Sequence, residues 1–288
     1  MKNLKIQVIL FYYNRPSLVK HMALKTMLES DYDNWELSFV DDSSDQHSDE
    51  ILEIFFEENP QYKDKKDRVK IFKTNDSIEE KKERGEAIFG LVANDSMRES
   101  DAEITLMLCD DDGVIHDYLS KLNSYYLNNP ERIHSYSKVI PYNPLKGRKT
   151  EAKKGEWVEG NSGLEYKEFS FMPENYLNCR GDSPHAENSL DSSQVSWRRS
   201  KAIEDEVLFP YPKTSNLDAV IYNKMDKKWG ECHFNGIIGQ YKAFWEGQNA
   251  YRQDAEVEKR FNQVDLSAQE LEECGRSKTK TLKNGETI

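Results

Sequence analysis

Three adjacent carboxylates follow an apolar run in the segment LMLCDDDG, residues 106–113. The run begins at Ile104 and has the length and composition of a strand buried in a sheet. Adjacent anions repel one another. A turn whose only role is to end a strand typically contains glycine, asparagine or a single aspartate. A divalent cation explains Asp110, Asp111 and Asp112, because Mn²⁺ and Mg²⁺ prefer oxygen ligands and Mg²⁺ is often held by one or two carboxylates together with substrate phosphates. The alternative is a helix N-cap with acidic residues in the first turn.

A second acidic pair, Asp41 and Asp42, follows the apolar segment 35–40. A carboxylate in such a loop can accept hydrogen bonds from a ribose or from a base edge. The alternative for this pair is an ordinary aspartate-rich turn.

The elements that must position these residues are four strand–helix units in the first 130 residues. We expect strands at 5–12, 35–40, 69–72 and 104–108 and helices at 17–30, 49–60, 79–98 and 116–130, with residues 64–68 (DKKDR) as a solvated linker. Such alternation predicts a parallel sheet with right-handed crossovers. Ligands of open parallel sheets bind at the carboxyl ends of the strands, which is where both acidic clusters and the loop 12–15 are expected.

The second half of the chain has a weaker pattern. Residues 141–163 are polar and predict an exposed hairpin or long loop, and 166–171 predict a further strand. Residues 217–230 predict a helix that ends at Gly230. The segment after about 250 is dominated by charge and predicts one or two solvated helices and a loose end.

The order of these motifs resembles the nucleotide-diphosphate-sugar glycosyltransferases of the GT-A fold, in particular the large inverting family 2. The matching motifs are Tyr-Tyr-Asn-Arg-Pro at 12–16, Val-Asp-Asp-Ser-Ser at 40–44, Arg-Gly at 84–85, Cys-Asp-Asp-Asp at 109–112 and His-Asp-Tyr-Leu at 116–119. Cys109 stands where many members have the first aspartate of the DXD motif, and His116 replaces the usual proline. The resemblance is clear over residues 4–130 and weak over 190–250.

The resemblance implies a role for each matching residue. Tyr12, Asn14, Arg15 and Asp41 would hold the nucleoside, Arg84 would lie near the base or diphosphate, and Asp110 would belong to the donor site. Asp111, with Asp112 as its neighbour, would bind Mn²⁺ or Mg²⁺. An inverting transferase also needs a general base on the acceptor side. Asp191 is the preferred candidate, and Asp218 is the alternative.

The resemblance also implies the fold and its division. We expect an α/β chain with a GT-A-type, mostly parallel sheet flanked by helices. Residues 1–250 would form one catalytic domain, with a Rossmann-like nucleotide-sugar-binding half at 1–130 and an acceptor half at 131–250. Residues 251–288 would be a charged C-terminal extension.

Composition limits the partners. The chain has 288 residues and a formal net charge of −12, which argues against nucleic acid as the main partner. No segment has the roughly 20 apolar residues of a membrane helix, so we expect a cytoplasmic protein and leave peripheral membrane contact open. The spacing of the four cysteines suggests neither a zinc site nor a disulfide framework.

These expectations together predict a metal-dependent transferase. It would move a sugar from a nucleotide-diphosphate donor to a hydroxyl of a saccharide or other acceptor, with inversion at the anomeric carbon. UDP is the expected nucleotide, because it is the common one in the family that the chain resembles. One alternative is a sugar-phosphate nucleotidyltransferase, although the segment 11–17 (FYYNRPS) lacks the glycines usual after the first strand of that class. The other alternative is a non-catalytic protein that retains a nucleotide-sugar site.

Overall fold

The computed structural model describes residues 3–41, 44, 46–74, 80, 89–142, 157–159, 165–167, 193–210 and 217–243. The first half contains β1 (Ile6–Tyr12), α1 (Pro16–Leu18), the π-helical turn η1 (Val19–Leu24), α2 (Lys25–Leu28), β2 (Trp35–Asp41), α3 (Ser48–Glu58), the 3₁₀ helix η2 (Pro60–Arg68), β3 (Val69–Lys73), α5 (Phe89–Glu99), β4 (Ile104–Cys109), β5 (Gly113–Val114) and α6 (Tyr118–Asn128). The second half contains β6 (His134–Tyr142), β7 (Trp157–Glu159), β8 (Glu165–Lys167), β9 (Val195–Arg198), α7 (Arg199–Glu204), α8 (Leu217–Trp229) and β10 (His233–Ala243).

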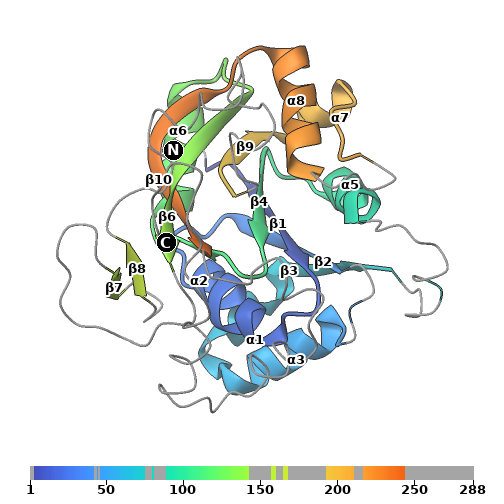
Figure 1. Cartoon of the computed structure of the whole chain (residues 1–288), viewed down its shortest axis with the longest axis vertical. Coiled ribbons are helices and arrows are strands. Elements are labelled where there is room, and N and C mark those ends of the chain that lie inside the picture. The colour runs from blue at the N-terminus through green and yellow to red at the C-terminus, as the bar shows by residue number, and fades with distance from the viewer. Residues whose placement is uncertain are drawn as a thin grey trace, which may run out of the picture.

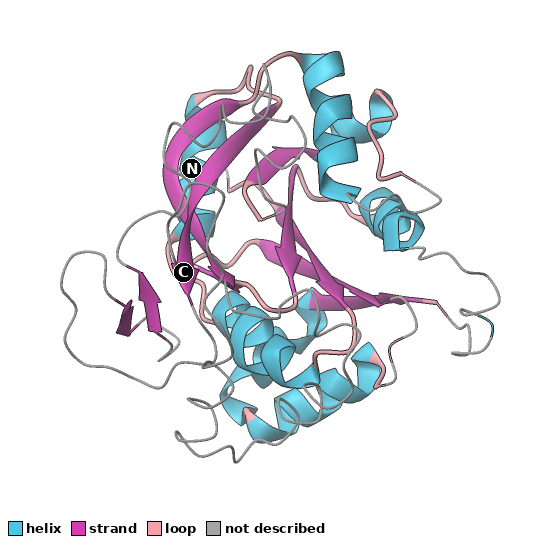
Figure 2. Cartoon of the chain, in the orientation of Figure 1, coloured by secondary structure: helices cyan, strands magenta, loops and turns pink. Residues whose placement is uncertain are grey.

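One mixed sheet runs through both halves of the chain. Its main path has the order β3-β2-β1-β4-β9-β6-β10-β5, and β7 and β8 branch from β6. The first four strands of this order are parallel, as expected for a nucleotide-binding half. β9 is antiparallel to both β4 and β6, whereas β10 runs parallel to β6. The sheet curls and is flanked by helices (Figures 1 and 2).

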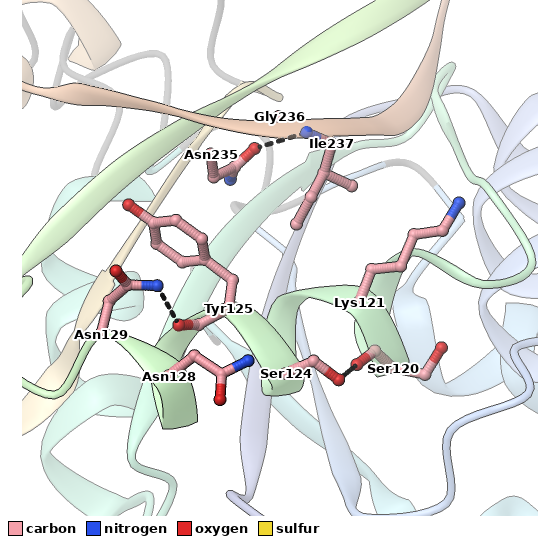
Figure 3. A pocket seen from close by; sticks show the side chains of 9 residues that line it. All are labelled: Ser120, Lys121, Ser124, Tyr125, Asn128, Asn129, Asn235, Gly236 and Ile237. Atoms are coloured by element: carbon pink, nitrogen blue, oxygen red, sulfur yellow. Dashed lines mark hydrogen bonds between the residues drawn. The ribbon is translucent and has the colours of Figure 1, made fainter.

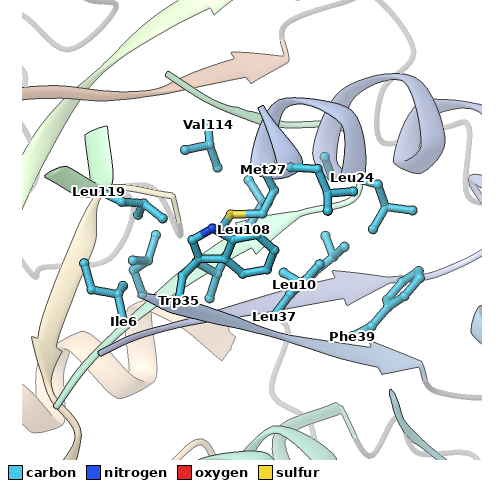
Figure 4. Packing of buried hydrophobic residues seen from close by; sticks show 14 of the residues in the cluster. Ile6, Leu10, Leu24, Met27, Trp35, Leu37, Phe39, Leu108, Val114 and Leu119 are labelled. Atoms are coloured by element: carbon cyan, nitrogen blue, oxygen red, sulfur yellow. The ribbon is translucent and has the colours of Figure 1, made fainter. Parts of the chain in front are cut away.

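The first strand is buried on both faces, which explains its continuous apolar sequence. Ile6, Val8 and Leu10 belong to a core cluster with residues of η1, α2, α3 and α6. Side chains from β1, β2, β4 and α2 meet in this cluster around Trp35 (Figure 4). Ile9 points to the opposite face, into a second cluster with residues of α5, α7 and α8.

The structure confirms the eight elements expected in the first half, with boundaries that differ by a few residues. The helix expected at 79–98 is observed as α5 from Phe89, and most of its earlier part lies outside the described residues. The segment 64–68 has no buried residue, as expected for a solvated linker, but it is helical. This segment completes the helix η2, where Lys65 donates to the Leu28 carbonyl at 2.6 Å and Arg68 donates to the Asp33 carbonyl at 2.8 Å.

The strands of the second half differ more from the sequence-based expectation. β6, β9 and β10 were not predicted, because their sequences mix polar and apolar residues. β7 lies in the region 141–163, where a hairpin or long loop was expected, and it pairs with β8 in the antiparallel direction. β8 covers the first part of the strand expected at 166–171, and the rest of that segment lies outside the described residues. The helix expected at 217–230 is α8.

No helix in the described ranges is both long enough and apolar enough to cross a bilayer. The charged extension at 251–288 lies outside the part of the chain that the structure describes.

A buried carboxylate in β2 gives the first testable prediction. Glu36 is 3% exposed and lies 2.8 Å from the Lys5 ammonium and 3.3 Å from that of Lys70. Burial acts to raise the pKa of Glu36, but hydrogen bonds from Lys5 and Ser100 and the two lysine charges lower it overall. The stabilisation by ionised Glu36 is therefore complete above its unfolded pKa and is lost as the pH falls through the lower folded pKa.

We expect Glu36→Gln to lower the free energy of unfolding at pH 7 by about 1.5–3 kcal/mol, because a buried charged hydrogen-bond network loses its charge. The difference from the wild type should shrink as the pH falls below about 4.5. Urea unfolding across this pH range measures both effects. Glu58→Gln is the control, since Glu58 pairs with Lys20 but is half exposed. A difference that is the same at every pH would contradict the assignment.

Candidate functional site

The loop after β1 and the loop after β4 meet through one guanidinium group. Arg15 Nη1 lies 2.9 Å from Asp110 Oδ1 and 2.8 Å from Asp111 Oδ2. The backbone N–H of Tyr13 also donates to Asp110 Oδ2 at 2.9 Å. All three charged side chains of this group are at most 6% exposed. The arginine thus holds two neighbouring carboxylates together at the carboxyl ends of adjacent strands.

The backbone conformation at residue 14 positions this arginine. Asn14 has a φ of 52°, a left-handed conformation that asparagine adopts more readily than most residues. Its N–H lies 3.3 Å from the Ser44 hydroxyl, so the turn also contacts the loop after β2. Pro16 then begins α1, where its missing N–H costs nothing.

The third aspartate has a different partner. Lys242 Nζ in β10 lies 2.9 Å from Asp112 Oδ2, and the two side chains are 10% and 0% exposed. The hydroxyl of Ser193 donates to the same carboxylate oxygen at 2.5 Å. Asp112 therefore joins the loop after β4 to the turn that precedes β9 and to β10.

The glycine after the aspartates packs closely against η1 and α2. A Cβ at Gly113 would lie 2.8 Å from the Met22 side chain and 3.1 Å from the Thr26 hydroxyl. That hydroxyl accepts a hydrogen bond from the Val114 N–H at 2.9 Å and donates to the Met22 carbonyl at 2.6 Å. The helical segment η1–α2 thus fixes the chain on the far side of the aspartate turn.

Asp41 organises the loop after β2. It is fully buried, and its two oxygens accept hydrogen bonds from the Ser44 N–H at 3.0 Å and the Ser48 N–H at 2.9 Å. Ser48 is the first residue of α3, so the carboxylate also interacts favourably with the positive end of that helix. His47 Nδ1 lies 3.7 Å from Asp41 Oδ2.

The remaining predicted site residues are distributed as follows. Tyr12 lies in the core below the loops, packs against Phe39 and donates from its hydroxyl to the Gln46 carbonyl at 3.0 Å. Arg84 and Asp191 lie outside the described residues, as does Asp42. Asp218 lies in the first turn of α8, and its side chain is not among those described. Their expected roles stay predictions.

Two residues of this arrangement were missed by the sequence analysis. Lys242 lies 130 positions from its partner Asp112, and Ser193 lies 81 positions away. Ser193 belongs to the segment that was considered for the general base. No local pattern distinguishes Lys242 from the other lysines of the chain, so only the pairing of β10 with β6 and β5 brings it to the aspartates.

The carboxylate oxygens of the aspartate cluster suit a hard divalent cation that is also coordinated by a bound ligand. Within the described ranges, no group of three or more His, Cys, Asp or Glu side chains is arranged to hold a metal by itself. Asp111 and Asp112 provide buried carboxylate oxygens, the donor type that Mn²⁺ and Mg²⁺ prefer. Since Mg²⁺ is commonly bound by one or two carboxylates plus phosphate oxygens, the residues fit a metal that binds together with a diphosphate.

A hollow lies away from the aspartate cluster. It has a volume of about 480 Å³ and is lined by polar residues of α6 and by Asn235, Gly236 and Ile237 of β10 (Figure 3). Asn235 precedes Lys242 by seven residues in the same strand, a separation of roughly 20 Å at the usual rise of a strand. This hollow is therefore separate from the aspartate cluster.

Comparison with known proteins identifies the fold. No protein-family model and no curated protein sequence matches the chain. Among solved structures, Staphylococcus aureus TarS 1–349 in complex with UDP-GlcNAc superposes with a TM-score of 0.57 at 16% identity, covering 94% of this chain and 70% of that one. The mannosyltransferase PcManGT from Pyrobaculum calidifontis, in complex with GDP-Man and Mn²⁺, gives 0.55 at 15% identity, covering 88% and 61%.

The chain has a GT-A-type fold. GalNAc-T7 with UDP, GalNAc and Mn²⁺ shares this fold at a TM-score of 0.52 and 12% identity, covering 84% of this chain and 44% of that one. The fold predicted from the order of the sequence motifs is confirmed. In this GT-A fold, the loops after β1, β2 and β4 converge around Arg15, Asp41 and the aspartate cluster.

A substitution at Asp41 tests whether this residue supports nucleotide binding in addition to holding the loop after β2. We expect Asp41→Ala to weaken nucleotide binding even without metal, because the loop that would contact the nucleoside loses its buried acceptor. We also expect a loss of about 1–2 kcal/mol in the free energy of unfolding, as for removal of a helix cap. Asp49→Ala is the control, since Asp49 lies in the first turn of the same helix and pairs with Lys73 on the surface. A binding loss seen only with metal would assign Asp41 to the metal site instead.

Proposed function

We propose that this protein is a glycosyltransferase that moves a sugar from a nucleotide-diphosphate donor to a hydroxyl acceptor. The observation that carries the proposal is the buried group of Arg15, Asp110 and Asp111 at the carboxyl ends of β1 and β4. In a parallel α/β sheet this edge is where nucleotide ligands bind. The structural neighbours TarS and PcManGT were solved with UDP-GlcNAc and with GDP-Man, which supports a nucleotide sugar as donor.

The donor would lie across the loops after β1, β2 and β4. Tyr12, Asn14, Arg15 and Asp41 form or support the loops proposed to hold the nucleoside, and Arg84 is proposed to contact the base or diphosphate. Asp110, held by Arg15 and by the Tyr13 N–H, would keep the donor loop in place. UDP is the proposed nucleotide, and GDP and dTDP are the alternatives that the binding assay must include.

A divalent cation, Mn²⁺ or Mg²⁺, is proposed to bind Asp111 and Asp112 together with the donor diphosphate. Mn²⁺ in the complexes of PcManGT and GalNAc-T7 supports this assignment. When bound, such an ion would act as a Lewis acid that stabilises the charge developing on the departing diphosphate. The protein's own contribution is to hold the two carboxylates in a buried, pre-arranged turn between β4 and β5.

An inverting reaction is part of the proposal and needs a carboxylate that removes the proton of the acceptor hydroxyl. Asp191 is the preferred base. The hydrogen bond of Ser193, two positions later in the sequence, to Asp112 supports this choice, because it ties that segment to the proposed metal site. Asp218 is the alternative, supported by the packing of its helix α8 on β4, where the Tyr222 hydroxyl lies 3.5 Å from Met107 Sδ.

The proposal includes residues 1–250 as one catalytic domain and a cytoplasmic location. The first is supported by the sheet that continues from β3 to β10. The second is supported by the spacing of the four cysteines in the sequence, which suggests no disulfide framework.

A thermal-shift panel of nucleotide sugars with and without Mn²⁺ tests the proposal. A ligand that binds only the folded state raises the unfolding temperature. We expect a shift with one nucleotide sugar that increases when Mn²⁺ is present, followed by turnover of that donor. Binding without hydrolysis or transfer to any acceptor would favour the non-catalytic alternative. No shift with any nucleotide sugar would contradict the proposed function.

A further inference from the structure

Lys242 is a buried cation that the fold alone does not explain. Its ammonium group lies 2.9 Å from Asp112 Oδ2, and both side chains are almost completely removed from water. Taking two charges out of water is costly, and hydrophobic residues of similar volume are often at least as stabilising as a buried ion pair. The pair therefore calls for a reason beyond stability.

The charges in this cluster nearly compensate one another. Arg15 contacts Asp110 and Asp111, and Lys242 contacts Asp112. Three negative and two positive groups leave one net negative charge among these contacting side chains. A divalent cation is attracted less strongly to such a cluster than to three carboxylates without fixed cations. A diphosphate would supply the missing negative charge.

We propose that Lys242 is a positioning residue that serves as the internal counter-ion of the aspartate cluster, so that a divalent cation binds firmly only together with a diphosphate. This inference rests on the proposed function, which places the metal at Asp111 and Asp112. Lys242 holds one carboxylate and offsets its charge. The bare ion then does not stay bound after the nucleotide has left, and donor and metal bind as a pair.

The test is the affinity for Mn²⁺ alone, without nucleotide, measured by calorimetry or by the paramagnetic resonance of free Mn²⁺. We expect Lys242→Met to bind Mn²⁺ about tenfold or more tightly than the wild type, because a nearby unit charge has this effect on a divalent ion even at the dielectric constant of water. The increase in Mn²⁺ affinity caused by added UDP should become correspondingly smaller. Lys242→Arg, which keeps the charge, should stay close to the wild type in both measurements.

Lys20→Met is the matched control. Lys20 is another largely buried lysine, with an 11% exposed side chain, and it pairs with Glu58 away from the aspartates. Its substitution should leave the Mn²⁺ affinity unchanged. If Lys242→Met binds Mn²⁺ no more tightly than the wild type does, the counter-ion role is wrong, and Lys242 is a structural partner of Asp112.

Loss of folding in Lys242→Met would still give an answer. The loss of the positive charge beside Asp112 would then be the cause, and the proposal expects added Mn²⁺ to restore folding, measured by circular dichroism. Failure of Mn²⁺ to restore it would contradict the proposal. The proposed function has a separate outcome, since a wild-type protein that binds neither UDP nor any nucleotide sugar would refute the transferase assignment. Normal UDP and Mn²⁺ binding with no difference in the variants would refute only the role of Lys242.

Discussion

Asp111→Asn is expected to abolish the Mn²⁺-dependent part of nucleotide-diphosphate binding while the fold persists. An amide is nearly isosteric with the carboxylate, but it carries no charge and is a poorer ligand for a hard cation. Substitution of residues that only support metal ligands typically costs about 10–100-fold in metal affinity, so the loss of a direct ligand should cost at least about 100-fold. Arg15 keeps its contact with Asp110 at 2.9 Å, which should preserve the turn.

Calorimetry with UDP in the presence and absence of Mn²⁺ measures this effect. Asp117→Asn is the matched control. Asp117 lies six residues later in the sequence, its side chain is 42% exposed, and its carboxylate forms an ion pair with Lys121 on the surface. We expect the control to bind as the wild type does. Unchanged UDP affinity of Asp111→Asn in the presence of Mn²⁺ would refute the assignment of Asp111 as a ligand.

Asp191→Asn is expected to leave donor binding nearly intact and to remove most of the transfer activity. A general base contributes roughly 10²–10⁴ in rate, and an amide cannot take the proton of the acceptor hydroxyl. Donor binding should persist because the base acts on the acceptor and not on the diphosphate. The assay is donor hydrolysis and transfer to a panel of saccharide acceptors, with donor affinity measured in parallel.

Asp218→Asn distinguishes between the two candidate bases. If this variant loses turnover and Asp191→Asn retains it, Asp218 is the base and the reaction class stands. If both variants retain wild-type turnover, neither carboxylate is the base. A parallel loss of donor affinity in Asp191→Asn would instead indicate a role in binding the donor.

The local elements of the first half were determined by the sequence. The apolar run of β1 predicts a strand buried on both faces, and Ile6, Val8 and Ile9 do enter two different core clusters. Alternation of such runs with helical segments specifies a parallel sheet, and a parallel sheet brings its loops together at one edge. For this reason the convergence of Arg15 with Asp110 could be expected from the sequence, although the ion pair itself could not.

The second half depended on long-range pairing. β10 has the sequence HFNGIIGQYKA, whose two glycines and mixed polarity give no clear strand period, and its register with β6 contains irregularities at the bulged positions. The β6–β10 pairing is what makes it a strand. β9 has only 4 residues, and it lies between β4 and β6, with which it is antiparallel.

The sequence by itself determined that three aspartates follow a buried strand in a chain that resembles the GT-A glycosyltransferases, because strand periodicity and local motifs are properties of neighbouring residues. Only the tertiary structure decided how their charges are balanced. Arg15 reaches two of the aspartates from a loop 95 positions away, and Lys242 reaches the third from 130 positions away. A buried charge needs a partner, but the chain contains 40 lysine and arginine residues, and nothing in their local sequence shows which of them folding will bring to the cluster.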